Sequence, residues 1–136
     1  MRATVRDCLA GAGDRTCQAD LSETLKIIDV FDQQDRSRLP TEPDNPDHEP
    51  RFMLEVDFGE RHALLYLEAL KPAGHDIFLQ VATRKFFIPA FTCFESARLP
   101  SPKEDVVRVI TACFERDATS LLAWAKQQLF LKPSRT

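Results

Sequence analysis

Residues 51–58 read RFMLEVDF and carry the clearest pattern in the chain. Large apolar side chains occupy every second position: Phe52, Leu54, Val56 and Phe58. A period of two residues places such side chains on one face of a β-strand, so the pattern predicts a strand with one buried face. Gly59 and Glu60 follow, and this pair is typical of a tight turn between strands.

Three further strands are predicted after this turn. Residues 61–70 return as a second strand, although their pattern alone also suits a helix. Residues 71–74 (KPAG) form another turn, and residues 76–83 and 85–94 read as two more strands. The sequence therefore predicts a four-stranded antiparallel meander over about residues 51–94.

The N-terminal region is predicted to be partly helical. Residues 2–10 suit a short helix, and residues 11–19 read as a loop. Residues 20–36 begin with Asp20 and Glu23, which resemble a capping box, and this favours a helix. The segment KIIDVF within that range is rich in β-branched residues, so a strand stays open as the alternative.

The C-terminal region carries the strongest helix signal. Residues 101–104 (SPKE) combine a capping-box pattern with a proline at the first helical position, which predicts a helix over residues 101–115. A last helix is predicted from Asp117 or Thr119 to about Leu131, unless the two helices are one bent helix. Helices at both ends of a meander indicate an α+β fold with the helices packed on one face of the sheet.

Composition limits the domain organisation and the classes of partner. The chain has 136 residues, which fits a single domain over residues 1–136. Residues 39–50 are rich in proline and acidic residues and predict an exposed loop. The net charge of −3 argues against nucleic acid as a partner, although a local patch of Arg and Lys stays open as a weaker alternative. No apolar run reaches the roughly 20 residues of a membrane helix. The first residues do not resemble a secretory signal, so a cytoplasmic protein with reduced cysteines is expected.

The sequence carries no standard signature of catalysis, of a cofactor or of a metal site. It lacks the glycine-rich phosphate loops, zinc motifs and hydrolase motifs, so no catalytic residue, metal or cofactor is predicted. His62 and His75 fall at opposite ends of the predicted meander, too far apart to share a metal ion. Cys93 is expected to be a buried structural thiol, because nothing nearby in the sequence would activate it.

Residues 86–94 (FFIPAFTCF) show a conflict between two local rules. Apolar side chains on both faces of a strand are typical of a covered, central strand, whereas Pro89 belongs on an edge or at a bulge. An edge strand covered by a partner or by a second copy would satisfy both rules. A bulged strand covered by the domain's own helices would do so as well.

The predicted function is a non-enzymatic protein-binding module. The candidate interface residues are Phe87, Pro89 and Phe91 in this strand, together with Trp124, for which core packing is the alternative role. The expected partner is another protein or a second copy of the chain, in which case the protein is a homodimer. The alternative function is a small enzyme or ligand-binding domain with a pocket between sheet and helices. Its candidate lining residues are Tyr66, Glu68, Gln80 and Arg84.

Overall fold

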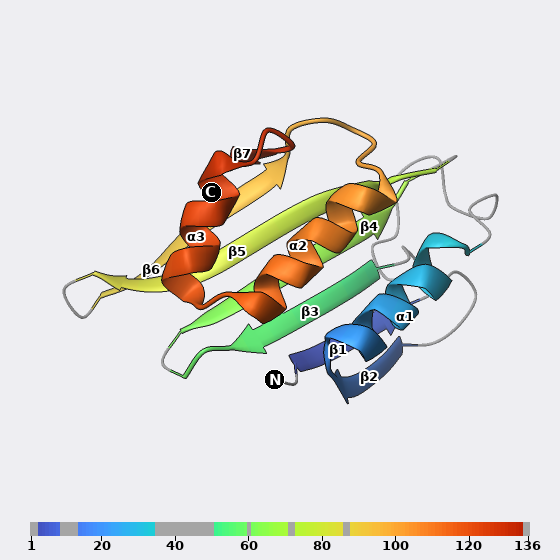
Figure 1. The fold of residues 1–136 in the computed structure, drawn as a ribbon, viewed down its shortest axis with the longest axis horizontal. Coiled ribbons are helices and arrows are strands. Elements are labelled where there is room, and N and C mark those ends of the chain that lie inside the picture. Colours follow the sequence, from blue (N-terminus) through green and yellow to red (C-terminus); the bar gives the residue numbers. More distant parts are fainter. Residues whose placement is uncertain are drawn as a thin grey trace.

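The structure is a computed structural model that describes residues 3–8, 14–34, 51–59, 61–70, 73–85 and 88–134. Within these residues, a seven-stranded sheet forms one layer and three helices form a second layer in front of it (Figure 1). The predicted α+β class is confirmed. The predicted count of four strands is too low, because strands also form on both sides of the meander.

The strands follow one another across an open, fully antiparallel sheet. They are β1 (Ala3–Cys8), β2 (Asp14–Ala19), β3 (Arg51–Asp57), β4 (His62–Ala69), β5 (His75–Lys85), β6 (Ile88–Ser96) and β7 (Leu131–Pro133). Their order in the sheet is β2-β1-β3-β4-β5-β6-β7. The predicted meander is therefore the run β3-β4-β5-β6 at the centre of this sheet.

Helix α1 (Leu21–Asp32) begins as the sequence predicts. The Asp20 carboxylate accepts a hydrogen bond from the Glu23 backbone N–H at 2.8 Å, which completes a capping box with the Glu23 side chain. Its β-branched residues do not make it a strand, because the helical period brings Ile28 and Phe31 together on the face that packs on the sheet. Both side chains are fully buried, and the Phe31 ring lies 6.0 Å from that of Phe52 on β3.

The predictions for residues 2–10 and 11–19 are wrong, because β1 and β2 form there instead of a helix and a loop. The reason lies in the side chains of β1 that face the core. Asp7 occupies one of these inward positions and is only 3% exposed, so the apolar alternation of a half-buried strand is interrupted. Arg15 on β2 compensates the buried carboxylate by donating to it at 2.8 Å.

Helix α2 (Lys103–Glu115) forms, but without the predicted capping box. Pro102 is its N-cap residue, and no side chain caps the helix. Ser101 instead pairs with His75 through hydrogen bonds between their backbones in both directions, at 2.8 and 2.9 Å. The Ser101 hydroxyl also lies 3.1 Å from that of Ser96, so the segment before α2 is tied to the start of β5 and the end of β6.

Helix α3 (Ala118–Gln127) is separate from α2 and begins at the predicted cap, where Asp117 accepts from the Ser120 N–H at 2.8 Å. It ends at Gln127 rather than near Leu131, because Leu131 starts β7 and pairs with Ser96. The predicted loop at residues 39–50 lies outside the described residues. In the part of the chain that the structure describes, no helix is both long and apolar enough to cross a bilayer.

The core lies between the inner face of the sheet and the three helices. Burial of each large side chain stabilises the fold by about 1.5–3 kcal/mol. The largest fully buried apolar side chains are Phe31, Phe52, Phe94, Ile28, Leu54, Leu65, Leu67, Ile77, Leu79, Ile110 and Leu121.

Candidate functional site

The face of the sheet opposite the three helices is the candidate site and is called the outer face below (Figure 1). Side chains alternate between the two faces, as β4 shows most clearly. Ala63, Leu65 and Leu67 point into the core and are at most 1% exposed, whereas Leu64 and Tyr66 between them are half-buried. No described helix covers the outer face, and its apolar side chains range from Cys93, which is 6% exposed, to Phe91, which is 54% exposed.

Apolar side chains gather at the centre of the outer face. The register places Met53, Tyr66 and Phe78 side by side on β3, β4 and β5. Together with their neighbours they form the outer patch, which consists of Met53, Leu64, Tyr66, Phe78, Ala82 and Phe91. A contiguous apolar area on a sheet face is typical of an interaction surface.

Phe91 is the most exposed member of the outer patch. Its side chain is 54% exposed, it lies opposite Ala82 on β5, and its ring is 6.4 Å from that of His62 on β4. The domain's own helices pack on the other face and do not cover it. Of the candidate interface residues in the predicted strand, Phe91 therefore has the exposure that an interface residue needs.

The position of Pro89 in β6 resolves the conflict between the two local rules. β7 pairs with only Phe94 to Ser96, and the Ser134 N–H donates to the Cys93 carbonyl at 2.9 Å from the same side. Successive residues of a strand point their backbone N–H and C=O groups to opposite sides, so residues an even number of positions apart point to the same side. Pro89 lies four positions before Cys93, so its nitrogen points to the side of β7, away from β5. The N–H that proline lacks is therefore not needed by the ladder with β5.

The structure does not bring all four predicted interface residues together. Trp124 lies on α3, on the opposite side of the sheet from Phe91. It is half-buried, and its ring lies 6.1 Å from that of the buried Phe130. Phe87 lies outside the described residues, and the structure describes the backbone of Pro89 but not its side chain.

Charged side chains surround the outer patch, and carboxylates predominate. The described carboxylates on the outer face are Glu55, Asp57, Glu68, Asp76 and Glu95, against the cations Arg6, Arg51 and Lys132. Lys132 lies 3.5 Å from Glu95, and the Arg51 guanidinium lies 5.9 Å from the Tyr66 ring centroid. Partial burial, with a smaller contribution from nearby Glu95, raises the pKa of Asp76 above its ordinary value.

The two described histidines lie on different faces of the sheet. His62 is exposed on the outer face, whereas His75 is fully buried on the inner face, where its ring stacks on Phe31 and its Nε2 lies 3.4 Å from Asp32. Cys93 is 6% exposed. Among the described residues, no group of three or more histidine, cysteine or acidic side chains is placed to hold a metal ion.

The residues suggested for an enzymatic pocket do not lie between the sheet and the helices. Tyr66, Glu68 and Gln80 are half-buried on the outer face, and the side chain of Arg84 is not among those described. Side chains of a strand alternate between the two faces of the sheet, and these residues occupy the positions that point outward, whereas the residues between them point into the core.

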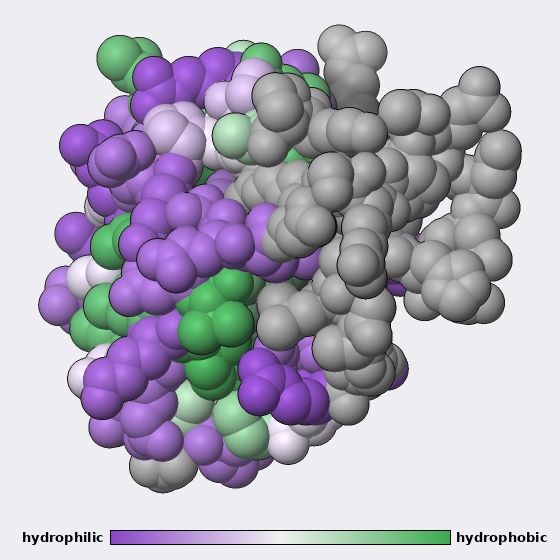
Figure 2. All heavy atoms as spheres, turned by 90° about the vertical axis from the view of Figure 1, so that its right-hand side faces the viewer, coloured by the Kyte–Doolittle hydropathy of each residue, from purple (hydrophilic) through white to green (hydrophobic). Residues whose placement is uncertain are grey.

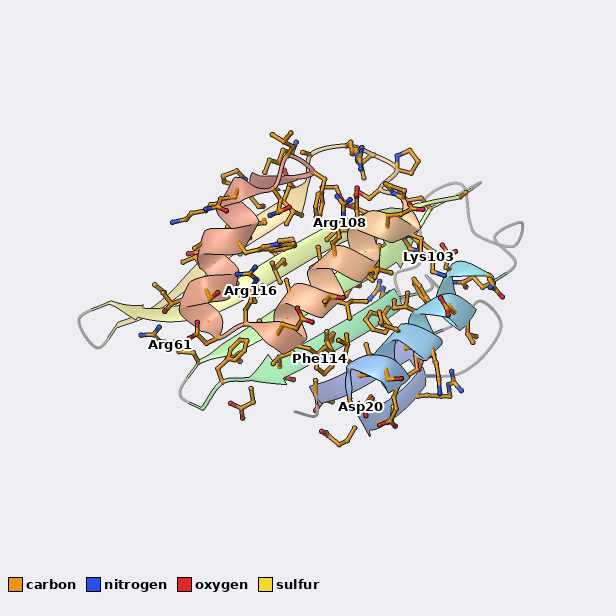
Figure 3. The ribbon with its side chains drawn as sticks, viewed as in Figure 1. Asp20, Arg61, Lys103, Arg108, Phe114 and Arg116 are labelled. Atoms are coloured by element: carbon orange, nitrogen blue, oxygen red, sulfur yellow. The ribbon has the colours of Figure 1, made fainter. Side chains whose placement is uncertain are left out.

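Two hollows on the helix side offer different linings. One of about 540 Å³ lies between the start of α1 and the end of α2, where Figure 3 places Asp20 and Phe114. It is lined by Asp20, Leu21, Ser22, Leu25, Phe114 and Glu115. The other, of about 350 Å³, is lined by Arg98, Arg108, Gln127, Gln128, Leu129 and Phe130. Among the described residues, neither lining contains a histidine or a cysteine.

Figure 2 shows the described residues at the end of the molecule that lies at the right of Figure 1. Seen from that side, the described residues are mostly hydrophilic, and the hydrophobic ones form a narrow strip between them (Figure 2).

Met53, Leu64 and Phe78 were not predicted as site residues, although the sequence contains a signal for Leu64 and Phe78. Leu64 precedes Leu65, and Phe78 lies between Ile77 and Leu79, so β4 and β5 each carry apolar side chains on both faces. Such runs indicate strands with two apolar faces, only one of which the helices cover.

Comparison with known proteins finds no family model, no curated protein and no solved structure that matches this chain. The outer face therefore carries the functional inference by itself.

Proposed function

We propose that this protein is a non-enzymatic binding module that binds another protein through the outer face of its sheet. The observation that carries the proposal is the row of Met53, Tyr66 and Phe78 on adjacent strands, together with a Phe91 side chain on the same face that is 54% exposed. No described helix covers them, so a partner would remove this apolar surface from water.

The composition of the outer patch supports the proposal. Aromatic residues and methionine are enriched at the centres of protein interfaces, while charged residues are moved to the rim. The outer patch follows this arrangement, with Glu55 and Glu95 beside its apolar centre. Full burial of one Phe side chain such as Phe91 contributes about 1.5–3 kcal/mol, so a few such side chains supply the affinity.

The proposal is tested by co-purification from the native host with the full chain as bait. Phe91→Asp is expected to abolish recovery of a reproducible partner, because a carboxylate cannot be buried in an apolar interface without a large desolvation cost. The matched control is Leu129→Asp, which places the same charge at a side chain that is 97% exposed between α3 and β7.

Circular dichroism is used to check that both variants are folded before their recovery of the partner is compared. Unchanged recovery with folded Phe91→Asp, or equal loss with Leu129→Asp, would remove the outer patch from consideration.

A further inference from the structure

We infer that the partner presents a basic amphipathic helix to the outer face. This inference rests on the proposed function and specifies the chemistry of the partner. It is carried by the excess of carboxylates around the outer patch, by the short free edge of β6, and by the spacing of the apolar side chains.

The charges around the outer patch favour a cationic partner. Glu55 is exposed, lies next to Leu64 in the register, and forms no ion pair among the described residues. Asp76 lies directly opposite Glu68, and Glu95 lies opposite Phe78. Lysine or arginine side chains that flank the apolar stripe of a partner would be attracted to these carboxylates and would steer the encounter.

The same charges disfavour a second copy of this chain as the occupant. Two outer faces packed against each other would bring together two surfaces on which the described carboxylates outnumber the described cations. Like charges brought together in an interface suppress that association. The net charge of −3 of the whole chain acts in the same direction.

The edges of the sheet favour a helix over an added strand. β7 already pairs with the end of β6, and Pro89 removes a donor from the remaining edge. At the other edge, Arg15 to Gln18 of β2 are exposed, and none of these side chains is large and apolar. The sheet already binds helices on its inner face by packing apolar side chains against them.

The spacing across the outer patch suits the apolar stripe of a helix. Neighbouring strands lie about 4.8 Å apart, so Met53 on β3 and Phe78 on β5 are separated by about 10 Å. Apolar residues at positions i and i+7 of an α-helix, nearly two turns apart, are separated by a rise of about 10.5 Å. A two-turn apolar stripe therefore spans the row Met53, Tyr66 and Phe78.

The test is selection from a library of randomised 16-residue peptides displayed on phage, with the full chain immobilised. We expect the enriched peptides to carry a positive net charge and apolar residues at helical spacing. Synthetic copies of these peptides are then measured by fluorescence anisotropy. Phe91→Ser is expected to weaken their binding at least tenfold, and Leu129→Ser to leave it unchanged.

Charge is tested by a second matched pair of variants. Glu55→Lys turns an attraction into a repulsion at the outer patch and is expected to weaken binding about tenfold at low salt. Glu115→Lys makes the same change at an exposed residue of α2 and is expected to have no effect. Raising the salt concentration should reduce the difference between these two variants.

The possible outcomes separate this inference from the proposed function. Peptides without a positive charge whose binding is still lost in Phe91→Ser would overturn the basic helix and leave the outer face as a binding surface. Self-association that Phe91→Ser abolishes would replace the basic partner with a second copy. Failure to enrich any peptide, or equal loss in Leu129→Ser, would overturn both.

Discussion

Gly74→Ala should destabilise the fold by an amount that can be worked out from its surroundings. Gly74 has a φ of +91°, where an L-amino acid costs about 1–2 kcal/mol. An added Cβ would lie 2.3 Å from the Cβ of Pro100 and 3.2 Å from the carbonyl oxygen of Ser101. Such overpacking costs about 1–3 kcal/mol. We therefore expect a loss of about 2–5 kcal/mol in the free energy of unfolding.

Gly59→Ala is the matched control for this prediction. Gly59 has a φ of +93°, but an added Cβ would meet no atom within 4 Å, so only the backbone cost of about 1–2 kcal/mol applies. Both substitutions also restrict the unfolded chain, and that effect cancels in the difference. The difference of about 1–3 kcal/mol then measures the contact between Gly74 and Pro100.

Urea unfolding, followed by circular dichroism, measures both variants against the unsubstituted chain. The segment from Ala97 to Ser101 contacts the start of β5 through Pro100 and through the backbone pairing of Ser101 with His75. Equal losses in Gly74→Ala and Gly59→Ala would refute this arrangement, because they would mean that Pro100 does not occupy the space beside Gly74.

Two further predictions concern titratable groups. Partial burial raises the pKa of Asp76, so ionisation of its side chain destabilises the folded state as pH rises through that pKa. Asp76→Asn should therefore raise Tm at pH 7, and this gain should disappear below about pH 3.9, where the carboxyl is protonated in both states. A gain in Tm that persists below this pH would contradict burial as the cause. Burial raises the pKa of the Cys113 thiol to about 12. A maleimide at pH 8 should therefore label the exposed Cys17 quickly and Cys113 only after unfolding, because the thiolate is the reactive form. Mass spectrometry of the digested protein measures the labelling of each cysteine.

The parts of the fold that the sequence predicted well are those with a regular local signal. The alternation in residues 51–58 identified β3, and the capping box at Asp20 identified α1 in spite of its β-branched residues. In both cases the buried side chains repeat with the period of the element, so local pattern and tertiary packing agree.

The strands outside the meander depend on contacts that the local pattern does not contain. β1 buries Asp7, whose compensation by Arg15 becomes visible only when β1 and β2 pair. β7 contains only Leu131 to Pro133 and exists because Ser96 and its neighbours in β6 offer a free edge. A strand of this length has no period to detect, so the helix predicted from Asp117 or Thr119 extends through it to about Leu131.

The candidate site was predictable in part. The conflict between Pro89 and the apolar residues around it identified β6, where Phe91 is now found exposed. The rest of the outer patch comes from β3, β4 and β5, and the register that joins Met53, Tyr66 and Phe78 is a property of strand pairing. No spacing within a single segment indicates that these three side chains are neighbours.

Site-specific photo-crosslinking in the native host shows whether a partner binds at the outer face. A photoreactive phenylalanine analogue is placed at position 78 in the outer patch, or at position 129, where the native leucine is 97% exposed outside it. A partner bound to the outer face predicts a discrete crosslinked adduct from position 78 and none from position 129. No adduct from position 78, or the same adduct from both positions, would contradict the claim that the outer face is the binding surface.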